Sequence, residues 1–285
     1  IYSIKKKLSC KFLIVDHRLR PDSSKEAKLV KKILKQVFIQ SEILVWRGEK
    51  PHQNIQSVSR FKRYNLLFKK CDKYRIKNIL LGHHQDDLFE NFFIRLLRGS
   101  GLKGLISLDE ENKIDNKFLM RPLLYQTKED LIFLSNYVFN YYVKDPSNEN
   151  DKFQRIRVRK LIGELQNDGL DKNKFLKTIK NLKYSNETVN FYVEENIKKN
   201  TYFFSKKKQL ILNEFFFRQP YEIIFRSLSE SIKLMSRNYY SARGKKLDGI
   251  IKDVVNKHSF KSTLGGCIIE KVNQTVIITK EHKNN

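Results

Sequence analysis

A short segment in the first half of the chain carries two adjacent histidines followed by three carboxylates. These residues are His83, His84, Asp86, Asp87 and Glu90. Carboxylates at one site can orient a cationic amine and accept its proton, or bind phosphates that carry a metal ion. Acidic side chains in a first helical turn also favour the helix dipole, so Asp86 and Asp87 could serve only as caps. Because a cap needs only one acid, the segment indicates a functional cleft.

The spacing around this segment predicts a helix that begins near His84 and is closed by Gly99. Helical periodicity places Asp87 and Glu90 on one face, together with His83 just before the helix. The opposite face is apolar and consists of Leu88, Phe89, Phe92, Phe93, Leu96 and Leu97. We therefore expect the apolar face to dock on a sheet and the acidic face to point into a cleft.

The elements that position this helix alternate between short apolar runs and amphipathic helices. In chain order, we predict a strand at 11–15, a helix at 24–38, a strand at 41–46, a helix capped by Asn54, and a strand at 79–82. This alternation is typical of an α/β fold with a doubly wound parallel sheet. Such sheets bind ligands at the carboxyl ends of their strands, where Asp16, His17 and His83 are expected.

The 285 residues suit two domains of different character. We predict a catalytic α/β domain at residues 1–165. Residues 166–285 should form a smaller, mostly helical domain that ends in a β-hairpin, with Asn273 and Gln274 in the turn.

Composition limits the classes of function. A net charge of +26, shared by both halves of the chain, favours a polyanionic partner, although a lysine-rich bias without a partner gives the same count. The hydrophobic share of 40% excludes a wholly disordered chain. No apolar run has transmembrane length, so no membrane association is expected. Cys10, Cys71 and Cys267 form no CxxC pair, which disfavours a zinc or redox site and suggests reduced thiols in the cytoplasm.

Several blocks of the sequence resemble those of tRNA(Ile)-lysidine synthases, which are PP-loop ATP pyrophosphatases. The histidine–carboxylate segment resembles the signature of that family, and other blocks lie before and after it in family order. The matching blocks are residues 15–23, 55–64, 82–91, 98–105, 121–124, 144–148, the arginines Arg155, Arg157 and Arg159, and residues 263–267. Any one block is weak alone, but their shared order over residues 12–270 makes the match specific.

The resemblance implies an adenine nucleotide alpha-hydrolase-like fold and an ATP-dependent carbon–nitrogen ligase. Members of the family modify the wobble cytidine of tRNA(Ile) with a CAU anticodon. ATP, with Mg²⁺, adenylates the C2 carbonyl oxygen, the amine of L-lysine then attacks C2, and AMP leaves. The implied partners are therefore tRNA(Ile) and L-lysine, and the second domain is expected to bind the tRNA.

The resemblance also assigns expected roles to residues of the first domain. Asp87 and Glu90 should hold the lysine amine or metal-bound phosphates, and His83 should line the same cleft. Arg60 and Arg63, which share a helical face with Gln56, should reach phosphate charge or the base. A solvated basic face is the alternative for these two arginines.

The remaining expected contacts are with the nucleotide and the RNA backbone. Asp16 and His17 should lie beside the nucleotide, and Arg155 and Arg159 should contact the tRNA. Residues 144–148 match a family element but could equally form a plain turn. No protein metal site is predicted.

The sequence departs from the family pattern in three places. Arg18 stands where glycine is usual, and Ser59 stands where alanine is common. The phosphate loop, Ser-Gly-Gly-x-Asp-Ser, should precede Val15 and has no counterpart among these residues. We therefore expect an N-terminally truncated member without the first strand and phosphate loop, active only when extended upstream. The alternatives are a non-catalytic tRNA-binding remnant and another tRNA-modifying PP-loop enzyme, such as a 2-thiocytidine enzyme that would use paired cysteines.

Overall fold

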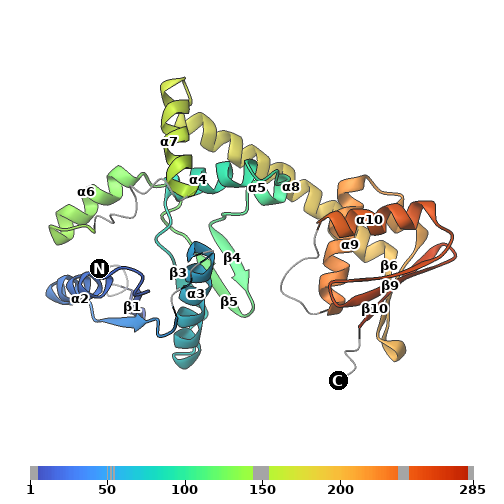
Figure 1. Cartoon of the computed structure of the whole chain (residues 1–285), viewed down its shortest axis with the longest axis horizontal. Helices are drawn as coiled ribbons and strands as arrows, with labels where there is room; N and C mark the ends of the chain where they lie inside the picture. The colour runs from blue at the N-terminus through green and yellow to red at the C-terminus, as the bar shows by residue number, and fades with distance from the viewer. Residues whose placement is uncertain are drawn as a thin grey trace. The chain divides into compact units, whose positions relative to one another are not determined.

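The structure is a computed structural model that describes residues 6–49, 51, 53, 55–143, 154–236 and 244–281. The chain forms two compact units, unit 1 (Ile1–Lys172) and unit 2 (Asn173–Asn285), which are shown in Figure 1. The predicted domain limit at residue 165 falls within helix α7 (Gln154–Asn167) and stays a prediction. The predicted helix cap Asn54, the element at 144–148 and the side chain of Gln56 lie outside the described residues.

Unit 1 opens with two parallel strands joined by a helix. Strand β1 (Phe12–Asp16) pairs with β2 (Ser41–Val45), and α2 (Ser23–Gln36) connects them. The helix is amphipathic, and it contacts both strands while burying Ala27. These elements confirm the strands and the helix that the apolar runs predict.

A second sheet in unit 1 contains three strands. Strand β3 (Asn78–Leu80) runs parallel to β5 (Lys117–Met120), which also pairs with the antiparallel β4 (Glu111–Ile114). Helix α3 (Ile55–Lys73) precedes β3 and supplies Cys71 to a small core with Ile79 and Leu119. The predicted parallel α/β character is thus confirmed, whereas hydrogen bonding among the described residues divides the strands between two sheets.

Helix α4 (Gln85–Leu96) follows β3 and carries the histidine–carboxylate segment. Its apolar stripe is buried through Leu88 and Phe89, and Gly99 ends the helical region with φ +66°. Helices α5 (Leu102–Leu105) and α7 pack against α4, and α6 (Lys128–Phe139) lies between them in sequence. The amphipathic pattern therefore predicted this helix and its buried residues Leu88, Phe89 and Phe92 correctly. The expectation for the end of the apolar face was wrong, because Leu96 and Leu97 are exposed, and the helix packs against α5 and α7 where a sheet was expected.

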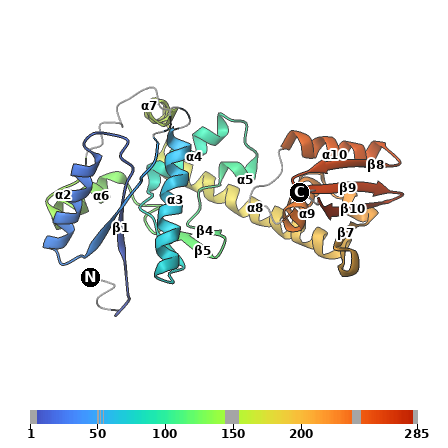
Figure 2. The same ribbon diagram turned by 60° about the horizontal axis from the view of Figure 1, so that its bottom comes forward.

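Unit 2 combines helices with a five-stranded antiparallel sheet, whose strand order is β6-β7-β10-β9-β8 (Figure 2). The elements are α8 (Lys172–Asn200), β6 (Thr201–Phe204), η2 (Ser205–Lys207), β7 (Gln209–Leu212), η3 (Glu214–Phe217), α9 (Tyr221–Ser236), α10 (Gly244–Asn256), β8 (Phe260–Leu264), β9 (Cys267–Val272) and β10 (Thr275–Lys280). The predicted hairpin is confirmed as β9–β10, with Asn273 in the left-handed region at φ +56°. Strands β6, β7 and β8 extend it beyond what the sequence predicts.

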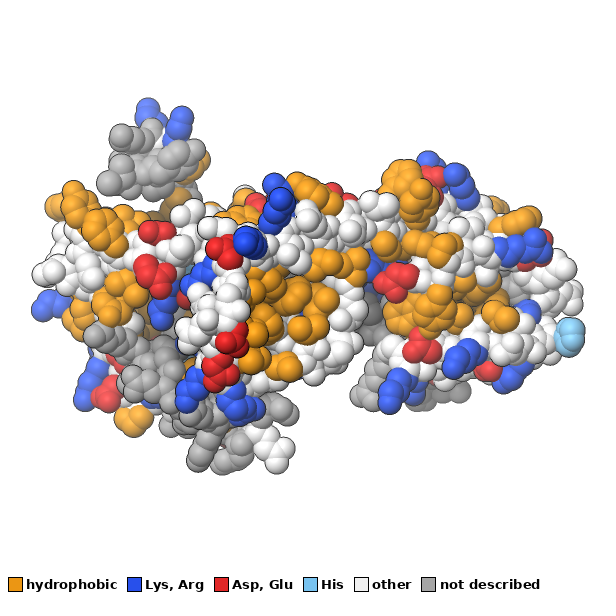
Figure 3. Space-filling view, turned by 90° about the horizontal axis from the view of Figure 1, so that it is seen from above, with side chains coloured by type: hydrophobic (Ala, Val, Ile, Leu, Met, Phe, Trp, Pro, Cys, Tyr) orange, Lys and Arg blue, Asp and Glu red, His pale blue; other side chains and the backbone are white. Residues whose placement is uncertain are grey.

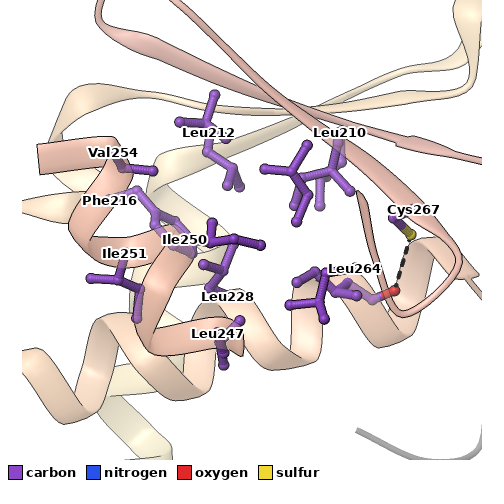
Figure 4. Packing of buried hydrophobic residues seen from close by; sticks show 14 of the residues in the cluster. Leu210, Leu212, Phe216, Leu228, Leu247, Ile250, Ile251, Val254, Leu264 and Cys267 are labelled. Atoms are coloured by element: carbon purple, nitrogen blue, oxygen red, sulfur yellow. Dashed lines mark hydrogen bonds between the residues drawn. The ribbon is translucent and has the colours of Figure 1, made fainter. Parts of the chain in front are cut away.

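The core of unit 2 lies between the sheet and helices α9 and α10 (Figure 4). Leu228 from α9, Leu247 from α10 and Ile269 from β9 are each fully buried there. Cys267 is also buried, and its Sγ donates a hydrogen bond to the carbonyl oxygen of Ile232 at 3.6 Å. Burial raises the pKa of this thiol to about 11, so Cys267 is a packing residue and not a reactive one.

The surface combines both charge signs with apolar patches. Figure 3 shows Lys and Arg side chains beside Asp and Glu side chains, and hydrophobic groups on both units. None of the helices in the described part of the chain is both long enough and apolar enough to span a membrane.

Candidate functional site: carboxylates and arginines around helix α4

The start of α4 fixes the position of its acidic residues. His84 is extended at the N-cap, and its backbone N–H donates to Asp87 Oδ2 at 3.1 Å. This contact satisfies one of the free N–H groups at the start of the helix region. Asp87 therefore does act as a cap, as the simpler interpretation predicts, but only one of its two oxygens is used for that purpose.

The other Asp87 oxygen belongs to a cluster with Glu90 and two arginines of α7. Arg155 Nη2 lies 3.2 Å from Asp87 Oδ1, and Arg155 Nε lies 3.0 Å from Glu90 Oε2. Arg159 Nε donates to the remaining Glu90 oxygen, Oε1. The Glu90 carboxylate is almost completely buried, while about a third of each arginine side chain is exposed. The structure thus brings the predicted amine-binding acids and the predicted RNA-binding arginines into one site.

Burial and charge shift the proton affinities of two groups in this site. Burial raises the pKa of Glu90, and the ion pairs with Arg159 and Arg155 offset only part of that effect. His83 has its pKa lowered to about 4, first by burial and also by the positive charges of Arg121, Arg60 and Arg155, while Asp87 acts in the opposite direction. His83 is therefore a neutral imidazole near pH 7, and its buried Nδ1 has no hydrogen-bond partner among the residues that the structure describes.

The predicted arginines of α3 border the same cluster. Arg63 is exposed, and its charge interacts with Asp87 and Arg155. Arg60 is also exposed and stacks its guanidinium over the Tyr64 ring at 5.4 Å from the centroid. Both arginines are exposed and also interact through their charge with groups of the site, so both interpretations of these arginines are compatible with their positions.

Arg121 also interacts with this site, although the sequence analysis does not predict it as a site residue. It follows β5, is only 3% exposed, and donates Nη1 to Asn112 Oδ1 and to the Asp109 carbonyl, each at 2.6 Å. Its charge lowers the pKa of His83. The sequence signal that could have identified Arg121 is its place in the matching block at 121–124. Its burial was not expected, because arginine side chains are rarely buried.

Asp16 lies at the carboxyl end of β1, where the sequence predicts it, and its carboxylate organises the turn into α2. It accepts hydrogen bonds from Ser24 Oγ at 2.6 Å, from Ser23 Oγ at 2.9 Å and from the Arg18 amide at 2.9 Å. Burial opposes ionisation, but these donors prevail and lower the pKa of Asp16. Arg18 in this turn has φ +53°, a conformation that glycine adopts without strain.

A pocket of about 320 Å³ adjoins this turn and is lined in part by His17, Arg20 and Ala27. The His17 ring meets Trp46 edge-on, and no residue in the described part of the chain forms a hydrogen bond with its buried Nδ1. Burial lowers the pKa of His17, and the nearby charge of Arg63 lowers it further. Arg63 therefore interacts electrostatically with both the pocket and the carboxylate cluster.

The donor set of this site suits organic ions. Paired carboxylates can bind an ammonium group, and the surrounding guanidinium groups can bind phosphate. Across residues 6–143, 154–236 and 244–281, apart from the few positions left out there, no group of three or more His, Cys, Asp or Glu side chains could hold a metal ion.

Comparison with known proteins identifies the family of the chain. The sequence profile of the PP-loop domain matches residues 2–165. A tRNA(Ile)-lysidine synthase of Wolbachia sp. subsp. Brugia malayi is 30% identical over 277 residues, which cover 94% of this chain and 63% of that protein. The enzyme of the same name from Orientia tsutsugamushi is 32% identical over 276 residues, covering 94% of this chain and 62% of its own length. The chain thus spans less than two thirds of these curated relatives.

One solved structure shares the fold. It is the U34-tRNA thiolase NcsA from Methanococcus maripaludis with its [4Fe-4S] cluster, and it aligns with a TM-score of 0.50 at 15% identity. The alignment covers 60% of each chain. At this identity the likeness concerns the fold alone.

Proposed function

The chain belongs to the PP-loop domain family, and from this premise we propose that it forms part of a tRNA(Ile)-lysidine synthase. The proposed reaction joins L-lysine to C2 of the wobble cytidine of tRNA(Ile) with a CAU anticodon. The observation that carries the proposal is the carboxylate pair of Asp87 and Glu90 on one face of α4. Two acids at a partly buried site give a cationic amine the charge partners it needs.

Glu90 is the proposed acceptor of the proton that the lysine amine must lose before it attacks. Its burial raises the pKa of the carboxyl group, which makes the ionised form a better base near neutral pH. Asp87 is held in place by the His84 amide, so it orients the amine. His83 remains neutral and lines the site without adding a positive charge.

The pocket beside the turn that follows β1 is the proposed place for the nucleoside part of ATP. ATP supplies the adenylyl group that activates the cytidine. The unpartnered His17 Nδ1 offers a hydrogen-bonding position, and Asp16 holds the turn that forms one wall. Arg63 and Arg60 would neutralise phosphate charge. Mg²⁺ would be carried by the phosphates, and we assign no step to a protein-bound metal.

The tRNA is proposed to contact both units. In unit 1, Arg155 and Arg159 offer partly exposed guanidinium groups beside the amine site. In unit 2, a cavity of about 1020 Å³ is lined by Lys207, Lys208 and Lys280 and by apolar side chains. This supports residues 166–285 as the tRNA-binding domain. A tRNA substrate and unpaired cysteines are consistent with a cytoplasmic protein.

Direct product analysis tests the proposal. The chain, and a version extended upstream, are each incubated with ATP, L-lysine and tRNA(Ile) transcript, and the nucleosides are identified by mass spectrometry. Conversion of the wobble cytidine to lysidine that requires both ATP and lysine is the expected result. A transcript with uridine at that position is the control. Absence of lysidine with both protein forms would refute the proposal.

Sulfur transfer is disfavoured as the chemistry of this site. Cys71 and Cys267 are buried in the hydrophobic cores of different units, so the exposed Cys10 has no second accessible cysteine with which to act as a pair. Adding a sulfur donor in place of lysine in the same assay should give no thiolated cytidine. A thiolated product would instead favour the rival class of tRNA-modifying PP-loop enzyme.

A further inference from the structure

The amine site of unit 1 already contains a cation supplied by the protein itself. We propose that Arg155 is a built-in occupant of the amine subsite and that the substrate amine displaces it on binding. This inference rests on the proposed function, because it takes Asp87 and Glu90 as the residues that receive the lysine amine.

The four carboxylate oxygens at the site are all accounted for. Asp87 Oδ2 accepts from the His84 amide, and Glu90 Oε1 accepts from Arg159. Asp87 Oδ1 accepts a hydrogen bond from Arg155 Nη2 at 3.2 Å. Glu90 Oε2 lies 3.0 Å from Arg155 Nε in an ion pair, but it accepts no hydrogen bond from the residues that the structure describes. An ammonium group has three donors and needs oxygens of this kind. Because the guanidinium of Arg155 lies against both of these oxygens, an ammonium group that contacts them together takes the place of Arg155.

The place of Arg155 in its helix and its exposure both favour its release. It is the second residue of α7, where a positive charge opposes the helix dipole, and the first turn of α7 contains no acidic residue. Its side chain is 38% exposed, so a displaced guanidinium can be taken up by solvent. Arg159 lies one turn further along the helix and neutralises Glu90 whether Arg155 stays or leaves. The buried carboxylate therefore retains a partner during the exchange.

The exchange has a measurable consequence for lysine affinity. While Arg155 occupies the carboxylates, lysine must compete with it, so the apparent affinity is lower than that of the open site. Partly exposed ion pairs of this kind are weak, so competition from Arg155 should lower the lysine affinity only by a factor of about two to five. Arg155→Met retains most of the side-chain length and removes the competing charge. It should tighten lysine binding by about that factor.

Isothermal titration calorimetry with L-lysine tests the inference. The proteins compared are the wild type, Arg155→Met, Arg157→Met and Asp87→Asn, after circular dichroism has shown that each is folded. Arg157 is the matched control, because it is exposed on the same helix two residues away and so faces about the opposite side. We expect tighter binding by Arg155→Met, unchanged binding by Arg157→Met, and roughly 10- to 150-fold weaker binding by Asp87→Asn.

Chemical rescue separates displacement from a structural effect. Added methylguanidinium should occupy the emptied position and return the lysine affinity of Arg155→Met towards the wild-type value, while leaving the wild type almost unaffected. If Arg155→Met does not fold, Arg155→Gln is measured in its place.

Two failures are distinguishable. Lysine binding that depends on Asp87 but is unchanged or weaker in Arg155→Met overturns the displacement inference and leaves the proposed function standing. Lysine binding that is absent, or that is unaffected by Asp87→Asn, overturns the amine site itself and the inference with it.

Discussion

The Asp87→Asn substitution separates the two tasks of one side chain. Asparagine retains an oxygen that can accept from the His84 amide, so the start of α4 should survive. What is lost is the negative charge. Removing an acid from a first helical turn costs about 0.3–1 kcal/mol, and losing a partly exposed pair with Arg155 costs about 0.2–1 kcal/mol more. The variant should therefore lose roughly 0.5–2 kcal/mol of stability and stay folded.

The effect on lysine binding should be larger than the effect on stability. A hydrogen bond between charged groups contributes about 1.5–3 kcal/mol, which corresponds to roughly 10- to 150-fold weaker binding. Calorimetry with L-lysine gives the affinity, and urea unfolding followed by circular dichroism gives the stability. Asp86→Asn is the matched control, because Asp86 lies in the same helical turn and pairs with Lys172 at 3.5 Å. Equal affinity losses in both variants, or no loss in Asp87→Asn, would refute the assignment.

Three other outcomes are expected from the described contacts. Hydrogen bonds from donors that include Ser24 lower the pKa of Asp16 in the folded state. The ionised carboxylate therefore stabilises the fold above about pH 4, and this contribution is lost as the pH falls through the folded-state pKa. Ser24→Ala should thus cost roughly 1.5–3 kcal/mol in urea unfolding at about pH 7 and much less at about pH 3, with exposed Ser57→Ala unchanged. The His83 ring proton should not titrate by NMR between about pH 8 and pH 5, since its pKa is about 4, and a midpoint near 6.5 would contradict its burial. Leu228→Ala should destabilise unit 2 by about 2–5 kcal/mol in thermal or urea unfolding, and a loss below about 1 kcal/mol would contradict the packing around it.

Local sequence patterns predict much of the fold and part of the candidate site. The apolar stripe with Leu88 and Phe89 predicts α4 because helical periodicity and burial impose the same spacing. That periodicity also put Asp87 and Glu90 on one face. The strands β1 and β2 and the β9–β10 hairpin follow from short apolar runs with turn residues between them.

The rest depends on contacts between distant residues. Arg155 reaches Asp87 across 68 positions, and only the packing of α7 against α4 brings them together. Arg121 was missed because its burial depends on the β4–β5 region around it. Strand β6 directly follows α8 and has only four residues, so its own pattern is too short to indicate a strand. Its pairing with β7 is what defines it.

Because β10 lies inside the sheet of unit 2, the sheet can form fully only when this late strand is present. This strand lies between β7 and β9, so the early strands β6 and β7 join the later strands only through it. Pairing of segments so far apart is slow to form and requires residues 275–280 to have been synthesised. A premature stop or a proteolytic cut before Thr275 would leave two open sheet edges, which invite aggregation.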